Sequence, residues 1–240
     1  MSDDTSGDSS SDPGPEEQAA SVRLPMFPLG AVLFPGLTVP LRVFEDRYLA
    51  LVQHLLAQPD PAERVFGSVA IREGYEVGSR GNQSLHRVGC RLQLTEVEEG
   101  DDGTLEVVAV CRDRFRLDSL EVDGPFPVGD GEVLPEPTER VDPEVADHAD
   151  ALFAAYQAVV AEIGGNVVAG AMPGDPTYRS WAMSAVAPLP LPDRQRLLET
   201  DSTTERFELL AEFFAAELRA INVIPSLPAV QLNRTGWSPN

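Results

Sequence analysis

Lysine is absent from this chain of 240 residues, so all 18 of its basic side chains are arginine. A phosphate-binding P-loop needs a lysine that reaches the terminal phosphates of a nucleotide. A serine–lysine protease dyad needs a lysine that takes the proton of the serine hydroxyl. Both kinds of catalytic centre are therefore excluded from these residues, and we expect a protein that catalyses no reaction.

Positive charge is scarce, because 18 arginines stand against 39 aspartate and glutamate residues and leave a net charge of -21. Nucleic-acid binding requires clustered cations, and an anionic membrane surface would be repelled by the same field. No apolar run is long enough to span a bilayer, and residues 1–20 lack the positive start and apolar middle of a signal peptide. We therefore expect no nucleic-acid partner, no membrane contact and a cytoplasmic location.

The chain has only two cysteines, Cys90 and Cys111, and three scattered histidines. Their spacing matches no metal-ligand pattern, and neither cysteine has an obvious histidine and aspartate partner. We expect no metal and no cofactor. The two cysteines fall on neighbouring strands with the same face parity, where a disulfide is conceivable, but two reduced, packed thiols are favoured in a cytosolic protein.

What the chain does contain is a strongly apolar stretch, Leu24–Phe44, which reads LPMFPLGAVLFPGLTVPLRVF. Its prolines and glycines prevent one continuous helix, because each proline removes a backbone donor and each glycine loosens the backbone. We predict short strands joined by tight turns, with most side chains in a core. Phe34 and Leu37, beside the turn at Pro35 and Gly36, are candidates for exposure because turn residues lie at surfaces.

Beyond this stretch and one segment of helical spacing at Glu45–Ala57, the apolar period is two up to about residue 135 and 3.6 after it, which predicts mostly strands followed by helices. The expected strands are Val65–Arg72, Arg87–Glu98, Thr104–Leu117 and Pro125–Leu134. The expected helices are Glu45–Ala57, a long helix from Pro143 to Gly164, Thr177–Val186, a short helix after Pro192 and one after a capping box at Ser202–Glu205. Tyr178 and Trp181 are expected to lie in the core of the helical bundle.

This pattern predicts an α+β protein, in which a small, partly closed β-barrel is followed by a helical bundle. Four segments are expected along the chain. They are a disordered acidic leader at 1–21, a β-rich part at 22–135, the helical bundle at 136–222 and a C-terminal arm or tail at 223–240.

A row of arginines, Arg112, Arg114 and Arg116, alternates along one predicted strand. It would suit a clamp for a carboxylate or an acidic peptide. The alternative is a solvated strand face that pairs with nearby acids such as Glu96 or Glu98, and we favour this alternative because such rows usually face water.

An ordered series of segments resembles the N-terminal, substrate-recognition domain of Lon proteases. The series comprises LPMFPLGAVLFPGLTVPLRVFEDRYLALV (24–52), FGSVAIRE (66–73), VGCRLQL (88–94), RDRFRL (112–117) and LPLPDRQRLLETDSTTERFELL (189–210). No single piece is specific, but their order covers Leu24 to Ile221. The resemblance implies a PUA-like pseudobarrel of the Lon N-terminal type, here without the ATPase and protease domains.

The resemblance also implies a function, namely non-catalytic binding of unfolded or extended polypeptides, as an adaptor or modulator in protein quality control. An ATP-dependent protease is a further expected partner. The candidate polypeptide-binding residues are Phe34, Pro35 and Leu37, with Glu73–Ser84 as a rim. Two alternatives stay open: a small-molecule module with a pocket between barrel and bundle, and an unrecognised Lon-like hydrolase.

Overall fold

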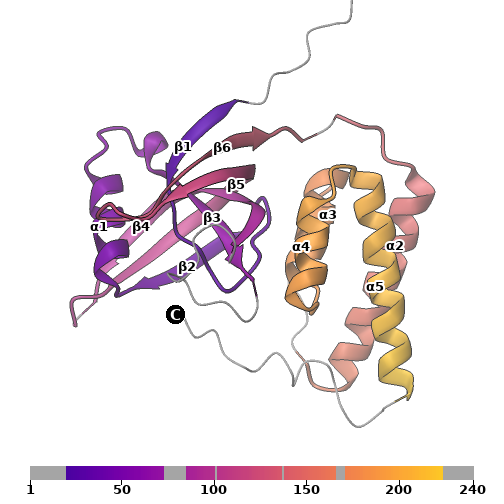
Figure 1. Cartoon of the computed structure of the whole chain (residues 1–240). Helices are drawn as coiled ribbons and strands as arrows, with labels where there is room; N and C mark the ends of the chain where they lie inside the picture. Colours follow the sequence, from indigo (N-terminus) through magenta and orange to yellow (C-terminus); the bar gives the residue numbers. More distant parts are fainter. Residues whose placement is uncertain (1–19, 73–84, 101, 137, 166–170, 224–240) are drawn as a thin grey trace, which may run out of the picture.

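The computed structural model describes residues 20–72, 85–100, 102–136, 138–165 and 171–223, and in this part a β-sheet precedes a group of helices (Figure 1). The strands are β1 (Ser21–Pro25), β2 (Thr38–Val43), β3 (Val65–Ile71), β4 (Leu85–Glu99), β5 (Leu105–Glu121) and β6 (Val128–Leu134). The helices are α1 (Asp46–Leu56), the short η1 (Pro61–Glu63), α2 (Pro143–Glu162), α3 (Pro176–Val186), α4 (Leu191–Glu199) and α5 (Thr203–Val223). The predicted α+β class is confirmed: α1 and η1 lie between β2 and β3, and the other four helices follow the last strand.

Three of the predicted segments fall largely on residues outside the described part of the chain. They are the acidic leader up to residue 19, the loop at 73–84 and the tail from residue 224 onward. The predictions for these segments therefore stay predictions.

The strands pair antiparallel in the order β1-β6-β5-β4-β3, and β2 adds to the first half of β5. The two ends of this order meet, because the residues after β1 run parallel to β3. Phe27 N donates to Gly67 O at 2.8 Å, and Leu29 N donates to Val69 O at 3.1 Å. The sheet is thus partly closed into a barrel, which removes most of the exposed edge that an open sheet would carry.

The apolar opening stretch forms short extended pieces around a tight turn, as predicted. Gly36 adopts a φ of 82°, which a side chain would strain, and its N–H donates to Cys111 O at 2.8 Å. The strand that follows alternates between exposed and buried residues, and Pro40 occupies an exposed position on it. Leu37 O accepts a hydrogen bond from Cys111 N at 2.9 Å, so the bonds between β2 and β5 fall on alternate residues from Leu37 onward. Pro40, opposite Val108, lies between them and points its missing N–H away from β5.

The helices begin where the sequence places their caps. Asp142 accepts a hydrogen bond from Glu144 N at 2.9 Å, and Asp175 accepts one from Tyr178 N at 3.1 Å. Ser202 accepts one from Glu205 N at 3.2 Å, which is half of the predicted capping box. These bonds satisfy backbone donors that the first turn of a helix leaves free.

Barrel and helices share one hydrophobic core. The ring centroids of Phe34 from the barrel and Trp181 from α3 lie 6.0 Å apart, and both side chains are buried. Within the helical part, Phe214 of α5 packs on Phe153 of α2, with ring centroids 5.2 Å apart. A smaller cluster around Phe115 fills the other face of the sheet. The two parts are therefore held together by apolar burial rather than by a linker alone.

A β-bulge in β5 overturns part of the prediction for the arginine row. Opposite β4, the register jumps between the Arg91–Asp113 pair and the Leu92–Cys111 pair, so Arg112 is an extra residue. The jump reverses the face parity, and Arg114 then shares a face with Cys90 and the main core. The prediction of a solvated arginine face is wrong for Arg114, which is fully buried.

The flanking arginines do lie at the surface, but their partners differ from those expected. Arg112 donates to the side-chain oxygen of Gln93 at 3.0 Å, and Arg116 pairs with Glu132 of β6. Neither uses Glu96 or Glu98, because the register places those acids farther along the β4–β5 hairpin.

The two cysteines lie in the same buried core and are not bonded to each other, as predicted. Cys90 Sγ donates to Leu33 O at 3.3 Å. Burial raises the pKa of the Cys90 thiol well above its ordinary value, and the neighbouring thiol of Cys111 adds to the rise. The thiolate that would act as a nucleophile is therefore disfavoured.

We expect both cysteines to resist alkylation by iodoacetamide in the native protein, at least about a hundredfold more than in urea, because labelling requires opening of the core. Mass spectrometry of native and denatured samples measures this difference. Rapid labelling of the native protein would contradict the burial of the two thiols.

The raised pKa also means that Cys90 costs no stability at neutral pH and reduces the free energy of unfolding only above its ordinary pKa of 9.0.

Candidate functional site

An apolar groove runs between the turn after Phe34 and helix α3, with a volume of about 550 Å³. Its lining consists of Pro35, Gly36 and Leu37 on the barrel side, Pro173, Gly174 and Asp175 before α3, and Tyr178, Trp181, Ala182, Ala185 and Val186 on α3. We call this set the apolar groove. It lies where the barrel and the helices meet, a place where binding sites often form.

Helix spacing explains the shape of the α3 wall. Tyr178, Ala182 and Ala185 lie four and three residues apart and so share one side of the helix. The alanines are small and leave a trough, while Tyr178 stands at its rim with 59% of its surface exposed. Val186 at the end of the helix is also exposed. Apolar side chains that remain in contact with water can bind apolar groups of a partner.

Trp181 forms the buried inner side of this groove and is held there by two arginines. The guanidinium carbon of Arg206 lies 3.2 Å from the centre of the Trp181 ring, and that of Arg114 lies 5.5 Å from it. All three side chains are almost completely buried. A cation over an indole face is attracted by the ring quadrupole, and the attraction grows when both groups are desolvated.

The two arginines are anchored by acids, a carbonyl and a hydroxyl from three different segments. Arg114 Nε donates to Glu136 at 2.8 Å, and its Nη1 donates to Leu198 O and to Asp201 at 3.1 Å. Arg206 Nη1 donates to Ser180 Oγ at 2.9 Å. Buried charges require such partners, so the network fixes the position of α3 against the barrel.

Desolvation lowers the pKa of Arg206 to about 9, and the nearby Glu136 opposes this fall. The guanidinium still carries its proton at neutral pH, so the attraction to Trp181 and Glu136 persists there.

Arg194 of α4 makes a second tie between the opening stretch and α3. Its Nη2 donates to Val32 O at 3.2 Å, and its Nη1 donates to Ala187 O at 3.0 Å just after α3. The guanidinium also lies over the ring of Phe34, 4.9 Å from its centre. Burial lowers the pKa of Arg194 to about 10, which leaves it charged at neutral pH. The barrel wall and the helical wall of the groove are thereby held at a set distance.

The predicted site residues divide between surface and core. Phe34 was a candidate for exposure beside a predominantly buried stretch, but it is 0% exposed because it packs on Trp181 under Arg194. Pro35 is buried and Leu37 is half-buried, and both line the apolar groove.

The helical side of the groove was missed from the sequence. Trp181 was expected in the core and is 1% exposed, which agrees, but Tyr178 was expected inward and points to solvent. The one signal available was the position of Tyr178 in the first turn of α3, three residues after the cap Asp175. Helical periodicity identifies a shared face but does not show which end of the face stays covered.

Within the described residues, no group of three or more histidine, cysteine, aspartate and glutamate side chains could hold a metal ion. Among the helices of the same part of the chain, none is long and apolar enough to cross a membrane. The apolar groove has little polar lining apart from Asp175, so its chemistry suits apolar groups rather than a polar small molecule.

Comparison with known proteins gives a consistent result. The family model described as the ATP-dependent protease La (LON) substrate-binding domain matches residues 23–215. The Lon protease of Phenylobacterium zucineum (strain HLK1) is 25% identical over 201 residues, which cover 82% of this chain and 25% of that protein. The Lon protease of Escherichia coli (strain K12) is 25% identical over 211 residues, which cover 86% of this chain and 26% of that protein. This chain thus spans about a quarter of the length of these relatives.

Two solved structures are similar over most of the chain. A Lon N-terminal domain protein from Xanthomonas campestris is 26% identical with a TM-score of 0.60, and the match covers 80% of this chain and 98% of that one. The N-terminal domain of the Mycobacterium avium complex Lon protease is 16% identical with a TM-score of 0.58, covering 81% and 98%. The second likeness concerns the fold alone.

Proposed function

Since the chain belongs to the family of the ATP-dependent protease La (LON) substrate-binding domain, we propose that it binds unfolded or extended polypeptide without cleaving it. The observation that supports this proposal is the apolar groove, with the half-buried Leu37 on one wall and the exposed Tyr178 on the other. Both residues lie inside the stretch that matches the family. The groove is therefore the proposed binding site.

Burial of apolar side chains supplies the binding energy in this proposal. Each Å² of apolar surface removed from water contributes about 25 cal/mol, with little dependence on sequence. Unfolded chains expose such side chains and folded ones hide them, so an apolar groove distinguishes the two states. Its walls are pre-formed by the Trp181 and Arg194 contacts, which reduces the entropy lost when a segment binds.

An adaptor role, in which the bound polypeptide is passed to an ATP-dependent protease, follows from the same proposal. The matched region corresponds to the substrate-binding domain and to about a quarter of the Lon proteases it resembles. Without lysine, these 240 residues hold neither a P-loop nor a serine–lysine dyad. Any cleavage would be carried out by another protein in this scheme. The scheme also places the protein in the cytoplasm with no nucleic-acid partner.

We expect Tyr178→Asp to weaken the binding of a reduced, alkylated model protein by about tenfold, because a carboxylate at the rim stays hydrated and adds no apolar burial. Fluorescence anisotropy of the labelled, unfolded model protein measures this affinity. Tyr178 is exposed, so the fold tolerates the change.

The matched control is Val122→Asp, because Val122 is also exposed but lies directly after β5, outside the groove. It should bind as the parent chain does. Equal losses in both variants would mean that the general negative charge, not the groove, controls binding. Cleavage of the model protein, abolished by one substitution, would support the hydrolase alternative instead.

A further inference from the structure

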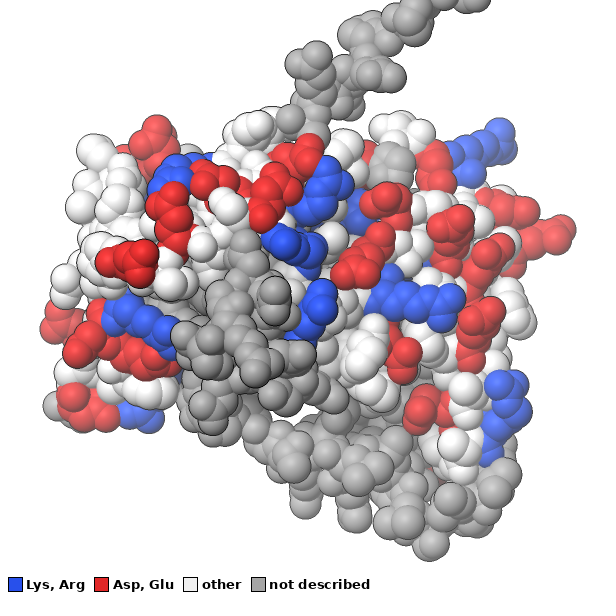
Figure 2. All heavy atoms as spheres, viewed as in Figure 1, with Lys and Arg blue, Asp and Glu red and all other residues white. Residues whose placement is uncertain are grey.

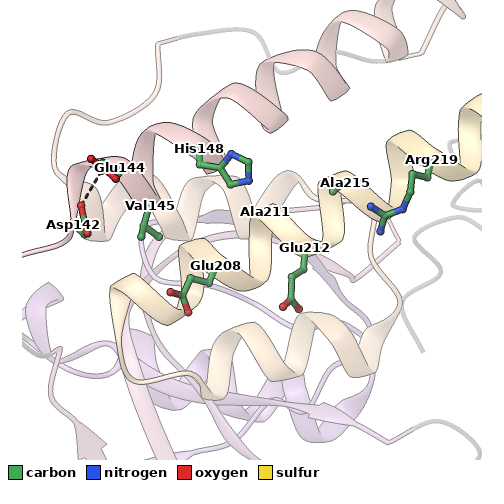
Figure 3. A pocket seen from close by; sticks show the side chains of 9 residues that line it. All are labelled: Asp142, Glu144, Val145, His148, Glu208, Ala211, Glu212, Ala215 and Arg219. Carbon is green, nitrogen blue, oxygen red and sulfur yellow. Dashed lines mark hydrogen bonds between the residues drawn. The ribbon is translucent and has the colours of Figure 1, made fainter.

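A second groove lies on the helical part, between α2 and α5, and it differs in chemistry from the apolar groove. Its volume is about 810 Å³. Asp142, Glu144, Val145 and His148 line it from the start of α2, and Glu208, Ala211, Glu212, Ala215 and Arg219 line it from α5 (Figure 3). We call this set the acidic groove. We propose that it docks a basic amphipathic helix of a partner protein.

The floor of the acidic groove is apolar and made of small side chains. Ala211 and Ala215 lie four residues apart on α5, and Val145 faces them from α2. Small residues on facing helices leave room for side chains of a third helix. A helix that lies in a groove between two others buries one apolar face against such a floor.

The carboxylates around this floor are left without cationic partners. Glu144, Glu208 and Glu212 form no ion pair with any residue that the structure describes. On the barrel, by contrast, the single side chain of Arg23 pairs with two acids, Glu121 at 2.6 Å and Asp130 at 2.7 Å. Figure 2 shows red acidic side chains gathered over the helical part of the molecule. Among the described residues, arginines of the sheet thus pair with acids of the sheet and its turns, while the three carboxylates named above pair with none.

Helix dipoles do not cancel this charge. The positive end of α2 lies at Asp142 and Glu144 and offsets part of their charge. Glu208 and Glu212 lie in the second and third turns of α5, where the dipole has fallen off. A strip of negative potential therefore runs beside the apolar floor, and lysine or arginine flanks on a partner would complement it.

A second copy of this chain does not fit the acidic groove. A symmetric pair would place one set of carboxylates against the other, and like charges at an interface cost free energy. A partner with the opposite charge is required. Arg219 marks one end of the groove, so a carboxylate on the partner near that end would set its direction. From Glu208 to Arg219 the groove follows α5 for about 16 Å, the length of a helix of three turns.

The test uses the full chain and a fluorescein-labelled helical peptide of about 18 residues, in which an alanine–leucine stripe is flanked by arginines. Fluorescence anisotropy gives its affinity at low and at physiological salt. A scrambled peptide of the same composition, without the stripe, is the reference. We expect the striped peptide to bind more tightly than the scrambled one and to weaken as salt rises.

The decisive variant is Glu208→Gln with Glu212→Gln, which we expect to weaken binding by about tenfold. Glu96→Gln with Glu98→Gln is the matched control, because it removes the same charge from exposed positions of β4, in the sheet and outside the acidic groove. We expect it to change the affinity by less than about twofold. Ala215→Trp fills the floor without changing the charge and should also weaken binding, and circular dichroism checks the fold of each variant.

The proposal is overturned if the scrambled peptide binds equally well, or if the two glutamine variants lose affinity equally. It is also overturned if the striped peptide does not bind at low salt, or if Ala215→Trp binds it as the parent chain does. These results are independent of the apolar groove, because Tyr178→Asp leaves the acidic groove intact. A failure of either proposal is therefore recognised separately.

Discussion

Trp181→Ala should lower the free energy of unfolding by about 3–5 kcal/mol, among the largest effects of any single substitution in this chain. Trp181 is 1% exposed and lies between the Phe34 ring and the Arg206 guanidinium. Its removal leaves a cavity at the contact of barrel and helices, and it leaves two buried cations without the ring that they face. Urea denaturation followed by circular dichroism measures the loss.

Trp181→Phe is the matched control for this prediction. A phenyl ring keeps most of the apolar volume and a weaker attraction for Arg206, so we expect the loss to be less than half of that for alanine. If Trp181→Ala lowered the free energy of unfolding by less than about 1 kcal/mol, the indole ring would not be part of a tightly packed core. Trp181→Ala also removes the inner side of the apolar groove. A fall in polypeptide affinity in this variant therefore has two causes, the altered groove and the weakened fold, and Tyr178→Asp is the variant that tests the groove.

Arg114→Met should lower the free energy of unfolding by about 3–5 kcal/mol, because it removes one partner from a buried charge network. Glu136 loses the 2.8 Å hydrogen bond that balances its charge, and Leu198 O loses its 3.1 Å donor. The methionine side chain fills a similar volume, so the loss reports the charge and the hydrogen bonds. The same denaturation experiment measures it.

Arg112→Met is an unusually close control, because Arg112 lies two residues away on the same strand. It is exposed and bonded only to Gln93 among the contacts of its side chain in the described residues, so its replacement should change stability by less than about 0.5 kcal/mol. Adding Glu136→Gln to Arg114→Met should not recover the loss, because Glu136 also pairs with the buried Arg206 at 3.8 Å, and the second substitution removes that carboxylate. Equal effects at the two arginines would contradict the burial of Arg114.

Local features of the fold could be predicted from the sequence because their causes lie within a few residues. Asp142 and Asp175 precede prolines and accept hydrogen bonds from the first helical turn, so the starts of α2 and α3 follow from side-chain chemistry. Gly36 takes a positive φ at the turn after Phe34. The strand alternation of β2 likewise follows from the sequence around Pro40. Each feature needs only its own segment.

The candidate site could be predicted only in part, and the missing part is non-local. The segment around Pro35 and Leu37 was identified, but the opposite wall of the apolar groove comes from α3, about 140 residues later. Nothing near Phe34 in the sequence shows that Trp181 and Arg194 will cover it. Exposure is a property of the assembled fold, so a turn position alone did not determine it.

The sequence by itself determined the class of the protein. Its two periodicities, its caps and turns, its lack of lysine and its ordered similarity to a substrate-binding domain are all properties of the chain as written. Only the tertiary structure decided which side chains face the core and which face water. One extra residue at Arg112 reverses the parity of β5, and this buries Arg114 beside Trp181 instead of leaving it in water. The physical reason is that strand register is set by pairing between distant segments, and a shift of one residue moves every later side chain to the other face.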